Sequence, residues 1–220
     1  MSLAAACRRD PPEPAAIALP AELAAYAKFQ PGTWWVYQDS ATAVRDSVWV
    51  VECRSYVQRY GKAHEYPSDK FEQFEMRTAS SREAGQIKYT VNHSCPMSDR
   101  TNGQINGQSR PCWDVKRGVY APNGAGDAGY AFVFPYEALR GQDQTVYEFR
   151  GSSYIYWHTT PQAVGDTSYA DVLQVRLAYD ASEGRRVGYE WARNVGIVRR
   201  RIEQPTGPQT WTLVRHHVVQ

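Results

Sequence analysis

Apolar and polar residues alternate with a period of two along most of the chain, most clearly in its C-terminal half. Because successive side chains of a β-strand point to opposite faces, this period predicts strands with one apolar face. Short segments rich in Gly, Pro, Asn and Asp separate these strands, as is typical of turns between antiparallel neighbours. We therefore predict a meander of long antiparallel strands at 169–179, 187–191, 197–202 and 211–219.

The N-terminal half begins with a short helical segment and then adopts the same period of two. Leu23, Tyr26 and Ala27 have the spacing of one or two helical turns, and Pro31 and Gly32 end the segment. The alternation then predicts strands at 34–38, 47–57, 71–78 and 87–91. The first two of these strands form a hairpin, because a polar turn joins them.

The composition supports a β fold. Of the 220 residues 13% are aromatic, including 7 Trp and 15 Tyr, and aromatic side chains favour strands. A sheet of roughly ten strands must curl, or stack on a second sheet, to bury so many rings. We predict a mainly β protein with one strongly curved antiparallel sheet, a half-barrel or incomplete barrel, and a short N-terminal helix. Residues 21–220 form this single β domain.

Charge and motifs exclude several classes of function. Lys and Arg number 25 against 23 Asp and Glu, and a net charge of +2 gives no field that would attract nucleic acid. No apolar run approaches the ~20 residues of a membrane-spanning helix. The sequence contains no nucleophile elbow, phosphate-binding glycine loop or zinc-protease motif. We therefore expect neither an enzyme nor a cofactor or metal site. Asp39 and Asp46 are predicted to be solvated turn residues that bond backbone N–H groups.

The three consecutive arginines at 199–201 form the main local concentration of positive charge. On a strand Arg199 and Arg201 leave one face and Arg200 leaves the other, so the run alone makes no flat arginine patch. We predict cross-strand pairing with Glu190 and Glu203, which contributes a few tenths of a kcal/mol.

Residues 1–20 have the pattern of a bacterial lipoprotein, with small residues before Cys7 and several prolines after it. Because a secretory peptide also needs an apolar stretch of roughly 7–15 residues, we expect the gene to start upstream and Cys7 to be the mature N-terminus. Acyl chains on Cys7 would anchor the protein in a membrane, and the prolines would act as a stiff spacer. A disordered N-terminus with an incidental cysteine is the alternative.

Cys95 and Cys112 flank a polar, turn-rich segment, and we predict a disulfide between them. In an oxidising compartment this bond would close a loop of about 17 residues and contribute about 3 kcal/mol. It requires the two Cα atoms to approach within about 7 Å. Cys53 lies in an apolar run and is predicted to stay free as a small hydrophobic residue. The cysteine and histidine spacings do not fit a metal site.

The two ends of the chain carry aromatic motifs: residues 29–40 followed by 46–50, and residues 189–198 followed by 211–214. These stretches resemble a broad group of uncharacterised envelope lipoproteins of Gram-negative bacteria. The resemblance implies an opening strand and a closing hairpin around one curved sheet, a half-barrel similar to periplasmic lipoprotein-localisation factors. It also implies an outer-membrane lipoprotein that faces the periplasm or the cell surface. The resemblance implies no enzymatic reaction.

Three functions remain open. The first is a lipid-anchored envelope protein that binds an apolar ligand or a lipoprotein in its concave sheet. The second is a structural or adhesion module that contacts another protein through the predicted loops at 96–111 and 121–129. The third is an enzyme with dispersed residues. Four aromatic side chains are expected at or near the core, where they either meet each other or surround a ligand: Trp35, Tyr37, Trp191 and Trp211.

Overall fold

The computed structural model describes residues 15–59, 70–93, 104–105, 108–109, 113–120, 130–135, 139, 145–149, 152–159, 161–179, 186–204 and 207–220. Cys7, Cys95 and Cys112 lie outside these residues, and so does the predicted loop at 121–129. The lipidation and the disulfide therefore stay predictions. Cys53 is free, and its Sγ donates a hydrogen bond to Gln30 Oε1 at 2.8 Å.

The described residues form one short helix and sixteen strands. Their bounds are α1 Ala21–Ala27, β1 Trp34–Asp39, β2 Arg45–Arg59, β3 Lys70–Ser80, β4 Gln86–His93, β5 Gln104–Ile105, β6 Gln108–Ser109, β7 Trp113–Val119, β8 Tyr130–Pro135, β9 Thr145–Phe149, β10 Ser152–Thr159, β11 Gln162–Val164, β12 Thr167–Tyr169, β13 Val172–Tyr179, β14 Arg186–Ala192, β15 Gly196–Gln204 and β16 Gly207–His217.

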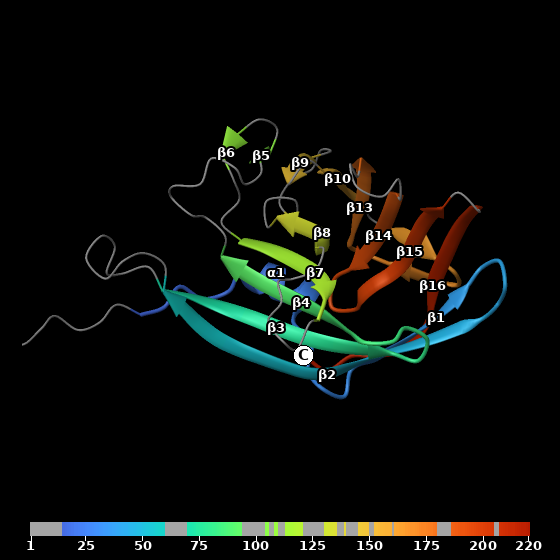
Figure 1. Cartoon of the computed structure of the whole chain (residues 1–220), viewed down its shortest axis with the longest axis horizontal. Coiled ribbons are helices and arrows are strands. Elements are labelled where there is room, and N and C mark those ends of the chain that lie inside the picture. Colours follow the sequence, from blue (N-terminus) through green and yellow to red (C-terminus); the bar gives the residue numbers. More distant parts are fainter. Residues whose placement is uncertain are drawn as a thin grey trace, which may run out of the picture.

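Fourteen of these strands belong to one antiparallel sheet, in which the order is β6-β5-β9-β10-β13-β14-β15-β16-β1-β2-β3-β4-β7-β8 (Figure 1). The sheet is strongly curled, so strands far apart in this order face each other. The rings of Tyr89 on β4 and Trp191 on β14 lie 6.2 Å apart, although five strands separate β4 from β14 in the sheet. The predicted curved sheet and meander are confirmed.

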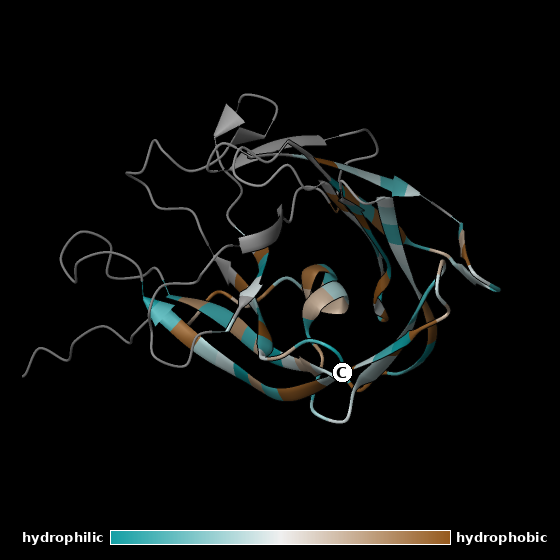
Figure 2. Cartoon of the chain, turned by 45° about the vertical axis from the view of Figure 1, so that its right-hand side comes forward, coloured by the Kyte–Doolittle hydropathy of each residue, from teal (hydrophilic) through white to brown (hydrophobic). Residues whose placement is uncertain are grey.

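Helix α1 lies inside the curl of the sheet (Figure 2). Leu23, Tyr26 and Ala27 are buried, as their helical spacing predicts, and they face the apolar interior. The backbone of α1 is also tied to the sheet, because Asn194 N donates to Ala25 O at 2.7 Å. The helix therefore supplies apolar side chains to the core that the curled sheet surrounds.

The first and last strands are neighbours in the sheet. β1 pairs with β2 on one side and with β16 on the other, and Trp35 is opposite His216. Just outside these strands, Thr33 Oγ1 donates to Val219 O at 3.1 Å and accepts from Val219 N at 2.9 Å. The two ends of the domain thus close against each other at the base of the core.

The strand predicted at 169–179 is interrupted in the structure. β13 begins at Val172, whereas residues before Ala170 belong to β12, which pairs only with β11 in a separate two-stranded sheet. The interruption coincides with Asp171, whose Oδ1 lies 3.2 Å from His158 Nδ1. Its carbonyl oxygen also accepts from Arg193 N at 3.1 Å. Asp171 therefore contacts two other segments of the chain instead of belonging to a strand.

No described helix combines the length and apolar character needed to cross a membrane.

Candidate ligand-binding site

Trp35 and Trp191 lie in the main core. Trp35 is 4% exposed, and its Nε1 donates to Val195 O at 2.6 Å while its ring meets the edge of Phe29 at 5.4 Å. Trp191 is 2% exposed and packs edge-on against Tyr89. The space left between these rings is only about 20 Å³. This part of the curl is filled by its own aromatic side chains.

Tyr37 packs against that core, whereas Trp211 is buried outside it. The Tyr37 hydroxyl donates to Ile197 O at 2.9 Å. Burial raises the pKa of this hydroxyl above its usual value, so it stays protonated. Two guanidinium groups lie near the Trp211 ring, with Arg200 Cζ at 5.5 Å and Arg82 Cζ at 6.0 Å from its centroid. Trp211 thus makes two cation–π contacts, which stabilise its buried position.

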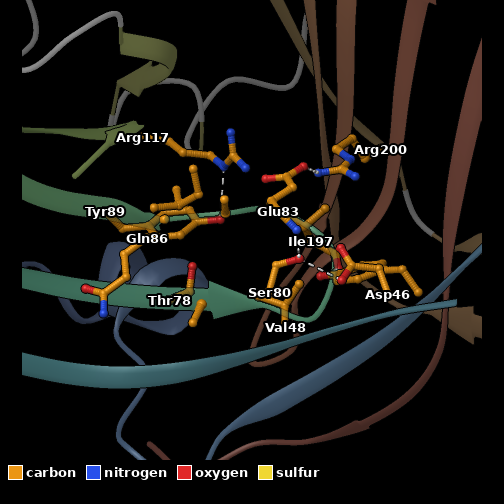
Figure 3. Close-up of a pocket in the computed structure, with 15 residues that line it drawn as sticks. Asp46, Val48, Thr78, Ser80, Glu83, Gln86, Tyr89, Arg117, Ile197 and Arg200 are labelled. Atoms are coloured by element: carbon orange, nitrogen blue, oxygen red, sulfur yellow. Dashed lines mark hydrogen bonds and ion pairs between the residues drawn. The ribbon is translucent and has the colours of Figure 1, made fainter. Parts of the chain in front are cut away.

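A larger cavity of about 390 Å³ lies between β1–β4, β7 and β15 (Figure 3). This volume falls within the range of about 300–1,000 Å³ that is typical of small-molecule sites. Side chains from strands that are distant in the chain converge on it, because the sheet curls. The described residues that line it are Tyr37, Asp46, Val48, Thr78, Ala79, Ser80, Glu83, Ala84, Gly85, Gln86, Ile87, Tyr89, Arg117, Ile197 and Arg200.

Arg117 projects from β7 into this cavity beside Tyr89 (Figure 3). Its Nε donates to the Tyr89 hydroxyl at 3.1 Å, and its Cζ lies 5.8 Å and 5.9 Å from the ring centroids of Tyr89 and Tyr189. Burial acts to lower the pKa of Arg117, but the tyrosines and Glu83 outweigh it and raise this pKa above its usual value. The guanidinium is therefore charged at any physiological pH.

Glu83 and Arg200 face each other at another part of the cavity. Glu83 lies in the turn between β3 and β4, and its Oε1 is 3.4 Å from Arg200 Nη1 on β15. The turn is fixed by Ser80, whose Oγ accepts from the backbone N of Glu83 at 3.0 Å. Ser80 Oγ also donates to Asp46 Oδ1 at 2.7 Å. Glu83 and Arg200 thus form an ion pair that links the β3–β4 turn to β15.

The predicted roles of the two turn aspartates are right in part. Asp39 accepts from the backbone N of Ala41 at 3.2 Å, which is the expected turn contact. Asp46 instead accepts from the hydroxyls of Ser80 and Ser81 at 2.7 and 3.1 Å. Neither carboxylate is solvated, because Asp39 is 3% and Asp46 2% exposed.

The arginine run divides between the two faces of β15 as predicted. Arg199 Nη1 lies 2.7 Å from Glu190 Oε1 on the outer face, which confirms that cross-strand pair. Arg199 and Arg201 line a groove of about 660 Å³ on the outer face of the sheet, which we call the outer groove, while Arg200 points into the inner cavity. Register with β14 and β16 fixes these directions.

Sequence reasoning missed Arg117, Tyr89 and Glu83 as functional candidates. A signal for Arg117 was present, because it continues the period-two face of Trp113 and Val115, both buried on β7. An arginine that extends an apolar strand face must find a partner in the interior. No comparable signal marks Glu83, because its partner Arg200 is distant in the sequence.

Among the described residues no group of three or more His, Cys, Asp or Glu side chains is placed to hold a metal ion. No protein-family model, curated protein or solved structure matches the chain.

Proposed function

We propose that this protein is a non-enzymatic binding protein that holds a small apolar ligand in the cavity of its curled sheet. The cavity of about 390 Å³ carries the proposal, because the aromatic side chains that fill the neighbouring core leave this space open. Val48, Ile87 and Ile197 give the cavity an apolar part, and charged side chains line the rest of it: Asp46, Glu83, Arg117 and Arg200. Ligand sites combine apolar walls with polar groups that fix the orientation of the ligand.

The lining side chains favour binding over catalysis. Among the described residues that line the cavity there is no histidine or cysteine to serve as base or nucleophile. The Asp46 carboxylate is engaged by two serine hydroxyls, and Glu83 is paired with Arg200. These carboxylates are held by neighbours rather than presented to a reacting group.

We further propose that the protein is anchored in the bacterial cell envelope through Cys7. The sequence supports this, with small residues before Cys7 and a proline-rich stretch after it. The chain joins the sheet at Ile17, whose N donates to Lys70 O and whose carbonyl oxygen accepts from Glu72 N, both at 2.8 Å. A tether from Cys7 would therefore end at Ile17, which leaves the domain free to face its ligand.

A structural or adhesion module is the second candidate. The close packing of Trp35 against Phe29 favours it, because a module needs a filled core rather than a ligand space. The two candidates differ in whether the inner cavity of about 390 Å³ takes up an apolar molecule.

Filling the cavity is expected to abolish ligand uptake. We expect the neutral fluorophore N-phenyl-1-naphthylamine to bind the wild-type protein, and Val48→Phe to weaken this binding at least tenfold, because Val48 lines the cavity. Fluorescence titration measures the affinity, and a denaturation midpoint checks that the variant is folded.

Val57→Phe is the matched control, since Val57 is on the same strand but 53% exposed and outside the cavity lining. It should leave the affinity unchanged. Absence of binding by the wild-type protein would favour the structural module. Equal binding by the Val48 variant would show that the fluorophore occupies a different site.

A further inference from the structure

We infer that the ligand of the inner cavity carries a single anionic group, a carboxylate, at one end of an apolar body, and that Arg117 and Tyr89 bind this group. The inference rests on the proposed function and names the chemical class of its ligand.

Arg117 makes no ion pair with another described residue, although Glu83 lies near enough for its charge to raise the pKa of Arg117. No aspartate or glutamate oxygen among the described residues lies within ion-pair distance of its guanidinium, whose contacts are Tyr89 and Tyr189. Arg117 is half-buried, and removing a charge partly from water is costly unless it is paired; two cation–π contacts offset only part of that cost. An anion in the cavity would complete the environment of this arginine.

The donors at this end of the cavity suit a carboxylate. Arg117 uses its Nε for the Tyr89 hydroxyl, which leaves both terminal nitrogens without a partner among the described residues. The Tyr89 oxygen is the acceptor in that bond, so its own hydrogen is available to donate. Guanidinium N–H groups and a phenolic O–H can together bind the two oxygens of one carboxylate.

The other charges of the cavity set the orientation and the charge of the ligand. Arg200 is already balanced by Glu83 at 3.4 Å, and Asp46 is held by Ser80 and Ser81. Figure 3 shows Arg117 beside Tyr89 at one side of the cavity and Asp46 at the other. A carboxylate at Arg117 therefore avoids Asp46, and the apolar body extends toward Val48 and Ile197. Asp46 and Glu83 balance the charges of Arg117 and Arg200 in the lining, so a carboxylate with one negative charge is repelled less than a phosphate with two.

The test compares ligands that share a chain and differ in the head group. Decanoate, 1-decanol and decyl phosphate are titrated against wild-type protein by displacement of N-phenyl-1-naphthylamine. We expect decanoate to bind at least tenfold more tightly than decanol and more tightly than decyl phosphate. Arg117→Met should remove the preference for decanoate and leave decanol binding unchanged, whereas Arg117→Lys should restore part of the preference.

Two further variants separate the head-group contacts from general effects. Tyr89→Phe should reduce the decanoate preference severalfold, because it deletes the phenolic donor while keeping the ring. Arg176→Met is the matched control, since Arg176 is an exposed arginine that lines the outer groove. It should leave all affinities unchanged, and an equal loss in this variant would assign the effect to overall charge and overturn the inference.

Glu83→Gln provides an independent check of the charge balance. Removing the Glu83 carboxylate leaves Arg200 without its ion-pair partner and gives the cavity lining a net positive charge. We expect decanoate affinity to rise severalfold and decyl phosphate to become the preferred ligand. An unchanged order of ligands would contradict the assignment of charges.

The failures of the inference and of the proposed function are distinguishable. Equal binding of decanoate and decanol by wild-type protein overturns the inference and leaves the apolar binding function standing. Tighter binding of decyl phosphate overturns the choice of a carboxylate. Binding of neither decanoate, decanol nor the fluorophore overturns the binding function and the inference together. The wild-type comparison remains decisive even if Arg117→Met does not fold.

Discussion

Replacement of Trp35 by alanine is expected to lower the free energy of unfolding by about 3–5 kcal/mol. The ring is 4% exposed and packs against Phe29 and Gly196, so its removal leaves a cavity in a part of the core with almost no free space. The Val195 carbonyl also loses its donor at 2.6 Å. Urea denaturation measures the effect as a lower midpoint with an unchanged slope.

Trp49→Ala is the matched control, because Trp49 lies on the neighbouring strand β2 and is 41% exposed. Changes at exposed positions are usually within about 0.5 kcal/mol. A loss at Trp35 no greater than that at Trp49 would show that the core lies on the other face of the sheet. Retained binding of N-phenyl-1-naphthylamine by a folded Trp35→Ala protein would place the ligand in the inner cavity and not among the core aromatics.

Gly196→Ala is the second substitution with a large expected effect. Gly196 has φ +97°, a region that costs a residue with a Cβ about 1–3 kcal/mol. An added Cβ would also lie 3.3 Å from Phe29 Cε2 and 3.4 Å from Trp35 Cζ2. Because both rings are held in the packed core, overpacking adds a further loss of about 1–3 kcal/mol. Thermal or urea unfolding measures the total loss of stability from the backbone and the overpacking.

Gly207→Ala separates the two contributions. Gly207 has φ +117°, but an added Cβ there would meet nothing within 4 Å. This variant should therefore lose only the backbone contribution. If the free energy of unfolding falls equally in the two alanine variants, the close approach of Gly196 to the aromatic rings does not contribute to stability.

The strands and their order in the C-terminal meander could be predicted because both depend on local pattern. Residues 186–217 alternate in polarity and carry their turns within the same stretch, so each strand finds its partner next in the chain. The split at Asp171 could not be predicted, since an aspartate flanked by apolar residues fits the alternation. Its contacts to His158 and Arg193 arise only after the strands assemble.

The candidate site was harder to predict than the fold. The period of two places Trp211 and Leu213 on one face of β16, and both are buried, but only Leu213 joins the main core. Trp211 instead meets Arg82 from the β3–β4 turn. Contacts of this kind, like that between Arg117 and Tyr189, form across the curl between strands distant in the sheet. Such contacts depend on the radius of the curl, which no local pattern fixes.

The pairing of β1 with β16 also determines when the domain can be completed during synthesis. Thr33 and Val219, which close this junction, are 186 residues apart, and a chain emerges from the ribosome N-terminal end first. Until β16 emerges, β1 has β2 on one side and an unpaired edge on the other. Unpaired edges attract strands of other molecules, and pairings of such long range form slowly. Translation that stops before β16 would therefore release a chain prone to edge-to-edge aggregation.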